Sequence, residues 1–120
     1  MEKKTLVLGA SENPGRYSYL AMHTLKNYGH PVIAIGKKPG EAAGIPIHKS
    51  LQMEKDIDTV TLYLNPSHQV AYYDYIISLK PKRVIFNPGA ENEELAAKCR
   101  ENGIEPIEAC TLVMLRTGQY

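Results

Sequence analysis

The feature that most constrains the fold is a regular alternation of short apolar runs with longer amphipathic segments along the whole chain. The apolar runs have the length and β-branched character of strands, and glycine or proline punctuates the segments between them. Continuous apolar runs are typical of strands that are buried on both faces. The pattern therefore predicts an α/β fold, a doubly wound, Rossmann-like parallel sheet of five strands with helices on both faces.

The expected strands cover residues 5–8, 31–35, 59–64, 83–86 and 104–108, and a brief edge strand is expected at 45–47. The expected helices cover residues 17–28, 67–79 and 91–102, the second with Ser67 as its N-cap. Helical spacing predicts these inward-facing residues in the first helix: Leu20, Ala21, Thr24, Leu25 and Tyr28. In the second helix it predicts Val70, Tyr73 and Ile77.

Length and composition limit the classes of protein that fit. The 120 residues suit one domain, 1–120, and 43% hydrophobic with 22% charged residues is typical of a globular chain. A net charge of +1 gives no general attraction to nucleic acid or to an anionic membrane. No apolar run approaches the roughly 18 residues of a membrane span, and the N-terminus does not resemble a signal peptide. We therefore expect a cytoplasmic protein.

The loop after the first strand, residues 9–16, reads Gly-Ala-Ser-Glu-Asn-Pro-Gly-Arg. Ligands of doubly wound folds bind beyond the carboxyl ends of the strands, so this loop is the first candidate site. Gly9 permits a sharp turn and close approach of a ligand, and Arg16 offers bidentate geometry to phosphate. Ser11 can donate a further hydrogen bond. The loop matches neither G-x-G-x-x-G nor a P-loop, and an ordinary strand-to-helix turn with a solvated arginine is the alternative.

The end of the second strand bears on the choice of ligand. NAD-binding folds usually carry an acid there, but this chain continues with Lys37, Lys38 and Pro39 and has no acid before Glu41. A basic strand end favours a phosphorylated ribose, either the 2′-phosphate of NADP or the 3′-phosphate of coenzyme A. Two surface lysines in an ordinary loop would give the same sequence.

The third and fourth loops repeat a pattern of asparagine and proline at a strand end. Pro66 restricts Asn65 to extended conformations, and with Ser67 these residues either line an adenine or pantetheine arm or only cap the helix. In the fourth loop, Gly89 allows close approach of a ligand, and Glu91 favours a helix N-terminus.

No arrangement of catalytic residues stands out. The four histidines, His23, His30, His48 and His68, lack metal-ligand spacing. His23 is expected to be exposed, and His68 lies nearest the candidate site. Cys99 is expected in the core, because it lies at helical spacing from Leu95. Cys110 either packs in the interior or faces the crevice, where it would meet the thiol of coenzyme A.

Taken together, the residues 6–16, the Asn65-Pro66-Ser67 turn, the 89–94 helix start and Cys110 resemble the stand-alone coenzyme A-binding domain family. That family is similar to the N-terminal domain of the succinyl-coenzyme A synthetase α subunit. The resemblance implies coenzyme A or an acyl derivative as the ligand, bound across the carboxyl edge of the sheet. The phosphorylated histidine of the synthetase belongs to another domain, so the resemblance does not extend to the ligation reaction.

The resemblance also implies which residues bind the ligand. The phosphates would contact Gly9, Ala10, Ser11, Asn13 and Arg16. The phosphorylated ribose would lie beside Lys37, Lys38 and Pro39. The nucleotide or pantetheine would lie beside Asn65, Pro66 and Ser67, with Gly89 at the far end.

Three hypotheses follow. The first is a non-catalytic module that binds coenzyme A or acyl-coenzyme A. The second is an NADP-linked oxidoreductase or redox sensor, and the third is a protein-interaction module without a ligand. No metal is expected. The apolar residues 112–115 pack either on the domain or on a second subunit, which leaves a homodimer open.

Overall fold

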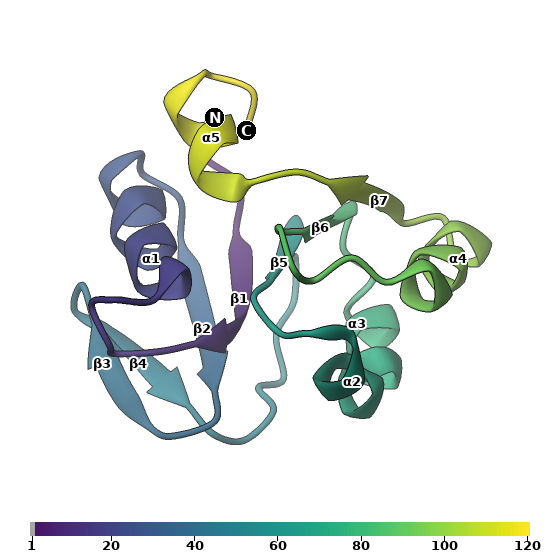
Figure 1. Cartoon of the computed structure of the whole chain (residues 1–120), viewed down its shortest axis with the longest axis horizontal. Coiled ribbons are helices and arrows are strands. Elements are labelled where there is room, and N and C mark those ends of the chain that lie inside the picture. The colour runs from purple at the N-terminus through teal and green to yellow at the C-terminus, as the bar shows by residue number, and fades with distance from the viewer. Residues whose placement is uncertain (1) are drawn as a thin grey trace.

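The computed structural model describes residues 2–120, and its centre is a seven-stranded sheet in the order β3-β4-β2-β1-β5-β6-β7. The parallel strands of this sheet are β1 (Thr5–Ala10), β2 (Val32–Gly36), β4 (Ile45–His48), β5 (Thr59–Leu62), β6 (Arg83–Phe86) and β7 (Glu105–Glu108). The doubly wound parallel fold is therefore confirmed (Figure 1).

The sheet has more strands than the five expected, because a hairpin extends one edge. The brief edge strand expected at 45–47 is β4, and β3 (Gly40–Ala42) pairs with it antiparallel. Strand β3 has no apolar run, and its structure comes from pairing with β4 rather than from its own sequence pattern.

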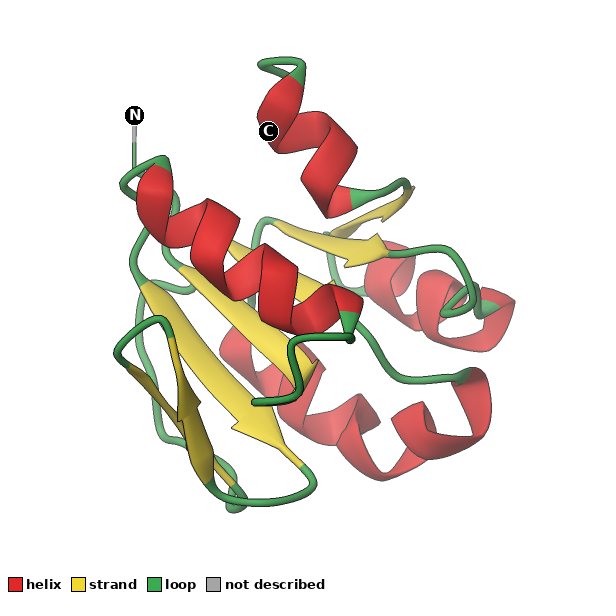
Figure 2. Ribbon diagram, turned by 60° about the vertical axis from the view of Figure 1, so that its left-hand side comes forward, coloured by secondary structure: helices red, strands yellow, loops and turns green. Residues whose placement is uncertain are grey.

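The helices cover the two faces of the sheet. Helix α1 (Tyr17–Asn27) and α5 (Thr111–Arg116) lie on one face of the sheet, and α1 crosses in front of the strands in Figure 2. The other face carries α2 (Pro66–Gln69), the 3-10 turn η1 (Val70–Tyr72), α3 (Tyr73–Leu79) and α4 (Glu93–Glu101). Alternating side chains of β1 divide between the two layers, with Leu6 and Leu8 in one core and Val7 in the other.

Two expected helix faces are partly wrong. Residues 67–79 do not form one helix, since η1 interrupts it and rotates the following residues, and Val70 is 56% exposed. Tyr73 is buried as expected, and Gln69 and Ile76 are buried beside it. In α1 the buried residues are Ser18, Ala21, Met22 and Leu25, while Leu20 and Tyr28 face solvent.

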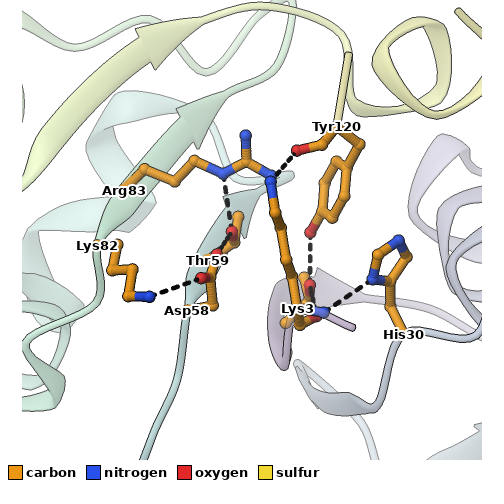
Figure 3. A network of polar contacts seen from close by, with 8 residues as sticks. Lys3, His30, Asp58, Thr59, Lys82, Arg83 and Tyr120 are labelled. Carbon is orange, nitrogen blue, oxygen red and sulfur yellow. Dashed lines mark hydrogen bonds and ion pairs between the residues drawn. The ribbon is translucent and has the colours of Figure 1, made fainter. Parts of the chain in front are cut away.

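A polar network ties together the amino ends of the strands, at the edge of the sheet opposite the candidate site (Figure 3). Arg83 donates from Nε to Thr59 Oγ1 at 2.8 Å, and its guanidinium lies 4.4 Å from the ring centre of Tyr120. The Tyr120 hydroxyl contacts Thr5. The backbone N–H of Lys3 donates to His30 Nδ1 at 3.0 Å. This network fixes the last residues of the chain against the sheet.

Candidate functional site

The candidate site is a cavity of about 750 Å³ at the carboxyl ends of β1 and β5. These two strands are neighbours in the sheet, and the chain crosses from one half of the sheet to the other between them, which makes this the switch point. The cavity volume lies within the range of roughly 300–1,000 Å³ that small-molecule sites have. Its walls come from Gly9, Ala10, Ser11, Glu12, Asn13, Arg16, Lys37, Lys38, Tyr63, Leu64, Asn65 and His68.

Gly9 makes the sharp turn expected from the sequence, and it is also required by a contact that the sequence did not reveal. Its φ is +94°, and a β-carbon there would lie 2.9 Å from the carbonyl group of Tyr63. The neighbouring strand end therefore requires glycine at this position with or without a ligand.

The rest of the first loop holds its shape through its own side chains. The Asn13 N–H donates to Ser11 Oγ at 3.0 Å, and the Gly15 N–H donates to Asn13 Oδ1 at 2.9 Å. Arg16 then stands at the N-cap of α1 without a capping side chain, and the first turn of α1 has no acid. The first amides of α1 are thus left to solvent or to a ligand, and amides in this position suit a phosphate.

The cavity is positively charged. Arg16, Lys37 and Lys38 all contribute to its wall and are exposed, while Glu12 brings the one carboxylate of that wall. The ion pairs found within residues 2–120 involve other residues, so these three cations stay available to an anion. A site of this kind favours a ligand with several phosphate charges.

The turn after β5 differs from expectation in its cap. Asn65, not Ser67, is the N-cap of α2, because its Oδ1 accepts from the His68 N–H at 3.1 Å and from Ser67 Oγ at 2.7 Å. Asn65 and His68 reach the cavity wall, whereas Pro66 and Ser67 do not. Pro39 is exposed in the second loop and also lies outside that wall.

A second cavity, of about 220 Å³, adjoins the first and shares Arg16, Tyr63, Leu64 and Asn65 with it. Gly89 lines this smaller cavity with a φ of +94°, and there is open space where its β-carbon would stand. The Gly89 N–H donates to Glu91 Oε1 at 2.9 Å, and the N-cap of α4 is Asn92. Glu91 thus holds the turn instead of beginning the helix.

Buried polar side chains join the carboxyl ends of β5 and β6 to the start of α5, and local spacing does not predict these contacts. Asn87 is 2% exposed and donates from Nδ2 to Thr61 Oγ1 at 2.7 Å and to the Leu62 carbonyl at 2.8 Å. Its Oδ1 accepts from the Thr111 N–H at 2.9 Å. Tyr63, which contributes to both cavities, falls within the strand expected at 59–64, and burial raises the pKa of its hydroxyl.

The remaining candidate side chains lie apart from the cavities. Cys99 is fully buried, as expected, and burial raises the pKa of its thiol to about 11. Cys110 is half-buried at the N-cap of α5 and lines neither cavity, so it does not face the crevice. His23 was expected to be exposed, but it is half-buried against Tyr19, with ring centres 4.5 Å apart.

Within residues 2–120, no three side chains of the metal-ligating types come together as a metal site. None of the helices described between residues 2 and 120 is long and apolar enough to cross a membrane.

The sheet topology defines a Rossmann-like domain, and a cavity with three cationic side chains in its wall lies at the switch point of its sheet. The chain belongs to the CoA binding domain family, whose sequence profile matches residues 3–116.

Solved structures share the fold. A crystal structure of an uncharacterized protein is 54% identical, with a TM-score of 0.97, and the match covers 100% of this chain and 99% of the other. A hypothetical protein from Pyrococcus horikoshii OT3 is 26% identical with a TM-score of 0.87, over 96% of this chain and 82% of that one. A Thermus thermophilus protein, 22% identical with a TM-score of 0.86 over 98% and 90% of the two chains, shares the fold. No curated protein matches the chain significantly.

Proposed function

We propose that the protein is a single-domain module that binds coenzyme A or an acyl derivative and catalyses no reaction of its own. The observation that carries the proposal is the cavity of about 750 Å³ at the switch point, where two loops bring Arg16, Lys37 and Lys38 to one wall. Coenzyme A carries phosphate at two places, a diphosphate in its chain and a monophosphate on its ribose. The membership of the CoA binding domain family supports the same ligand.

The two cavities suggest how such a ligand would lie. The diphosphate would sit between Arg16 and the first amides of α1, the two features that suit phosphate best. The ribose phosphate would face Lys37 and Lys38, and Asn65 would border the adenosine. The pantetheine arm would pass into the smaller cavity, of about 220 Å³, towards Gly89.

The test is a calorimetric titration of the protein with coenzyme A, 3′-dephospho-coenzyme A, NADP and NAD. The proposal expects saturable binding of coenzyme A, weaker binding without the 3′-phosphate, and weaker binding of both dinucleotides. Preferential binding of NADP would favour an NADP-linked oxidoreductase or redox sensor, since its 2′-phosphate also suits two lysines. Absence of binding by all four would favour a protein-interaction module.

A further inference from the structure

The carboxylate of Glu12 reaches from the first loop to the start of β3. A β-carbon on Gly40 would lie 2.6 Å from Oε2 of Glu12, and the Glu41 N–H approaches the same oxygen at 3.4 Å. Gly40 follows the end of β2 by four residues. The end of β2 is followed by no acid before Glu41, and Glu12 brings a carboxylate from another loop to the start of β3.

This carboxylate stands in a wall that is otherwise cationic. Glu12 shares the larger cavity with Lys37 and Lys38, and none of the ion pairs between residues 2 and 120 includes it. An ionised carboxylate only accepts hydrogen bonds, so a ligand group beside it needs a donor. A phosphate at the same place would be repelled, because it has negative charge and offers no donor.

We propose that Glu12 makes the site selective for a ligand whose ribose is phosphorylated at the 3′ position rather than at the 2′ position. Its carboxylate accepts a hydrogen bond from a free 2′-hydroxyl and excludes a phosphate from that position. The site then takes a ribose with a 3′-phosphate, as in coenzyme A, and rejects one with a 2′-phosphate, as in NADP. This inference rests on the proposed function, since it concerns the ligand of the same cavity.

The lysines by themselves do not make this choice. Nucleotides phosphorylated at the 2′ or the 3′ position carry the same charge, and Lys37 and Lys38 are exposed point charges that attract either one. A carboxylate next to the 2′ position distinguishes them. The 3′-phosphorylated ribose presents a hydroxyl donor to the carboxylate, whereas the 2′-phosphorylated ribose presents a phosphate dianion at the same place. In dinucleotide-binding folds an acid near the end of the second strand binds ribose hydroxyls in this way.

The position of Glu12 depends on the glycine opposite it. Any other residue at position 40 would push the carboxylate away, since its β-carbon would overlap the end of the Glu12 side chain. That side chain is flexible and exposed, so its displacement leaves the fold intact. Gly40→Ala therefore moves the carboxylate without removing it, and it complements Glu12→Gln, which removes the charge without changing the shape.

The experiment compares adenosine 3′,5′-bisphosphate with adenosine 2′,5′-bisphosphate by calorimetry at one fixed salt concentration. We expect the protein to bind the 3′-isomer at least tenfold more tightly. The ratio of the two dissociation constants, that of the 2′-isomer over that of the 3′-isomer, falls at least fivefold in Glu12→Gln, chiefly through tighter binding of the 2′-isomer. Gly40→Ala also lowers this ratio. The matched control is Glu41→Gln, which removes an exposed charge from the neighbouring position and leaves the ratio unchanged.

The ratio of the two isomers separates specificity from general electrostatics, because a lost negative charge strengthens binding of both by a similar factor. Suppose that coenzyme A binds but the unmodified protein binds the two isomers equally, or that the ratio is unchanged in Glu12→Gln. Either result would overturn the inference and leave the proposed function standing. Failure of the unmodified protein to bind coenzyme A at all would overturn the proposed function as well.

Discussion

The backbone of Tyr63 occupies the space into which a side chain at Gly9 would point. A β-carbon on Gly9 would lie 2.9 Å from both the carbonyl carbon and the carbonyl oxygen of Tyr63. The two strand ends are joined at the same place by the Tyr63 N–H, which donates to the Leu8 carbonyl at 2.9 Å. The floor of the site is thus a close contact between β1 and β5 that only glycine permits.

Gly9→Ala is expected to destabilise the protein by roughly 2–4 kcal/mol, through a positive φ and a backbone clash together. The matched control is Gly103→Ala, which has a φ of +71° and open space around the added carbon, and it should cost about 1 kcal/mol. Urea unfolding of the two variants measures the difference. Equal losses would show that the contact with Tyr63 is unimportant for stability.

The central parallel strands could be predicted because they are buried on both faces and therefore consist of continuous apolar runs, such as residues 6–8 and 84–86. Strand β3 could not, since Gly40–Ala42 carries no apolar pattern and is held by its partner β4. Helix α5 (Thr111–Arg116) was also missed, because six residues are too few for helical periodicity to be read.

The loops of the site could be predicted from the sequence, because ligands of doubly wound folds bind at the carboxyl ends of the strands, and Arg16, Lys37 and Lys38 all follow such ends. The contacts within the site could not be predicted. Glu12 approaches Gly40 across two separate loops, and Tyr63 reaches both cavities from the end of a strand. Such contacts depend on how the loops meet in space, which local spacing does not report.

The two kinds of cation should bind different parts of coenzyme A. Arg16→Ala is expected to weaken coenzyme A and 3′-dephospho-coenzyme A alike, by roughly 10–100-fold, because both ligands keep the diphosphate. The double variant Lys37→Ala/Lys38→Ala should weaken coenzyme A by roughly tenfold and leave the dephospho form nearly unchanged. Calorimetric titration of each variant with both ligands gives four dissociation constants, and each is compared with the value for the unmodified protein.

Neither change should alter the melting temperature of the free protein, since these side chains are exposed and form no ion pair within residues 2–120. Lys55→Ala, an exposed lysine that contributes to neither cavity wall, serves as the control for a general loss of positive charge. Equal weakening of both ligands by the lysine variant would contradict the assignment of the ribose phosphate to Lys37 and Lys38.

Asn87 is expected to contribute more to stability than any exposed asparagine of the chain. Asn87→Ala leaves the Leu62 carbonyl and the Thr111 N–H without their partners in a buried place, at a cost of roughly 2–4 kcal/mol. Asn102→Ala removes one exposed hydrogen bond to the Lys98 carbonyl and should cost less than about 1 kcal/mol. Urea unfolding compares the two variants, and similar losses would mean that water replaces the amide of Asn87.

The stability of the protein should fall as the pH drops, in part because of His30. Burial, with help from the nearby charges of Lys3 and Arg83, lowers the pKa of His30 below its ordinary value of 6.5. Its Nδ1 accepts a hydrogen bond from the Lys3 N–H, which only the neutral ring can do (Figure 3). The unfolded chain therefore binds a proton at a pH where the folded chain does not, and the free energy of unfolding decreases as the pH falls through 6.5.

His30→Asn tests this dependence, because an asparagine oxygen can still accept from the Lys3 N–H and does not titrate. Urea unfolding at several pH values between about 8 and 5 should show a shallower decline for the variant than for the unmodified protein. The carboxylates titrate in both proteins, so the difference between the two curves isolates the histidine. Parallel curves over this range would mean that His30 titrates alike in the folded and unfolded chains and has no part in the pH dependence.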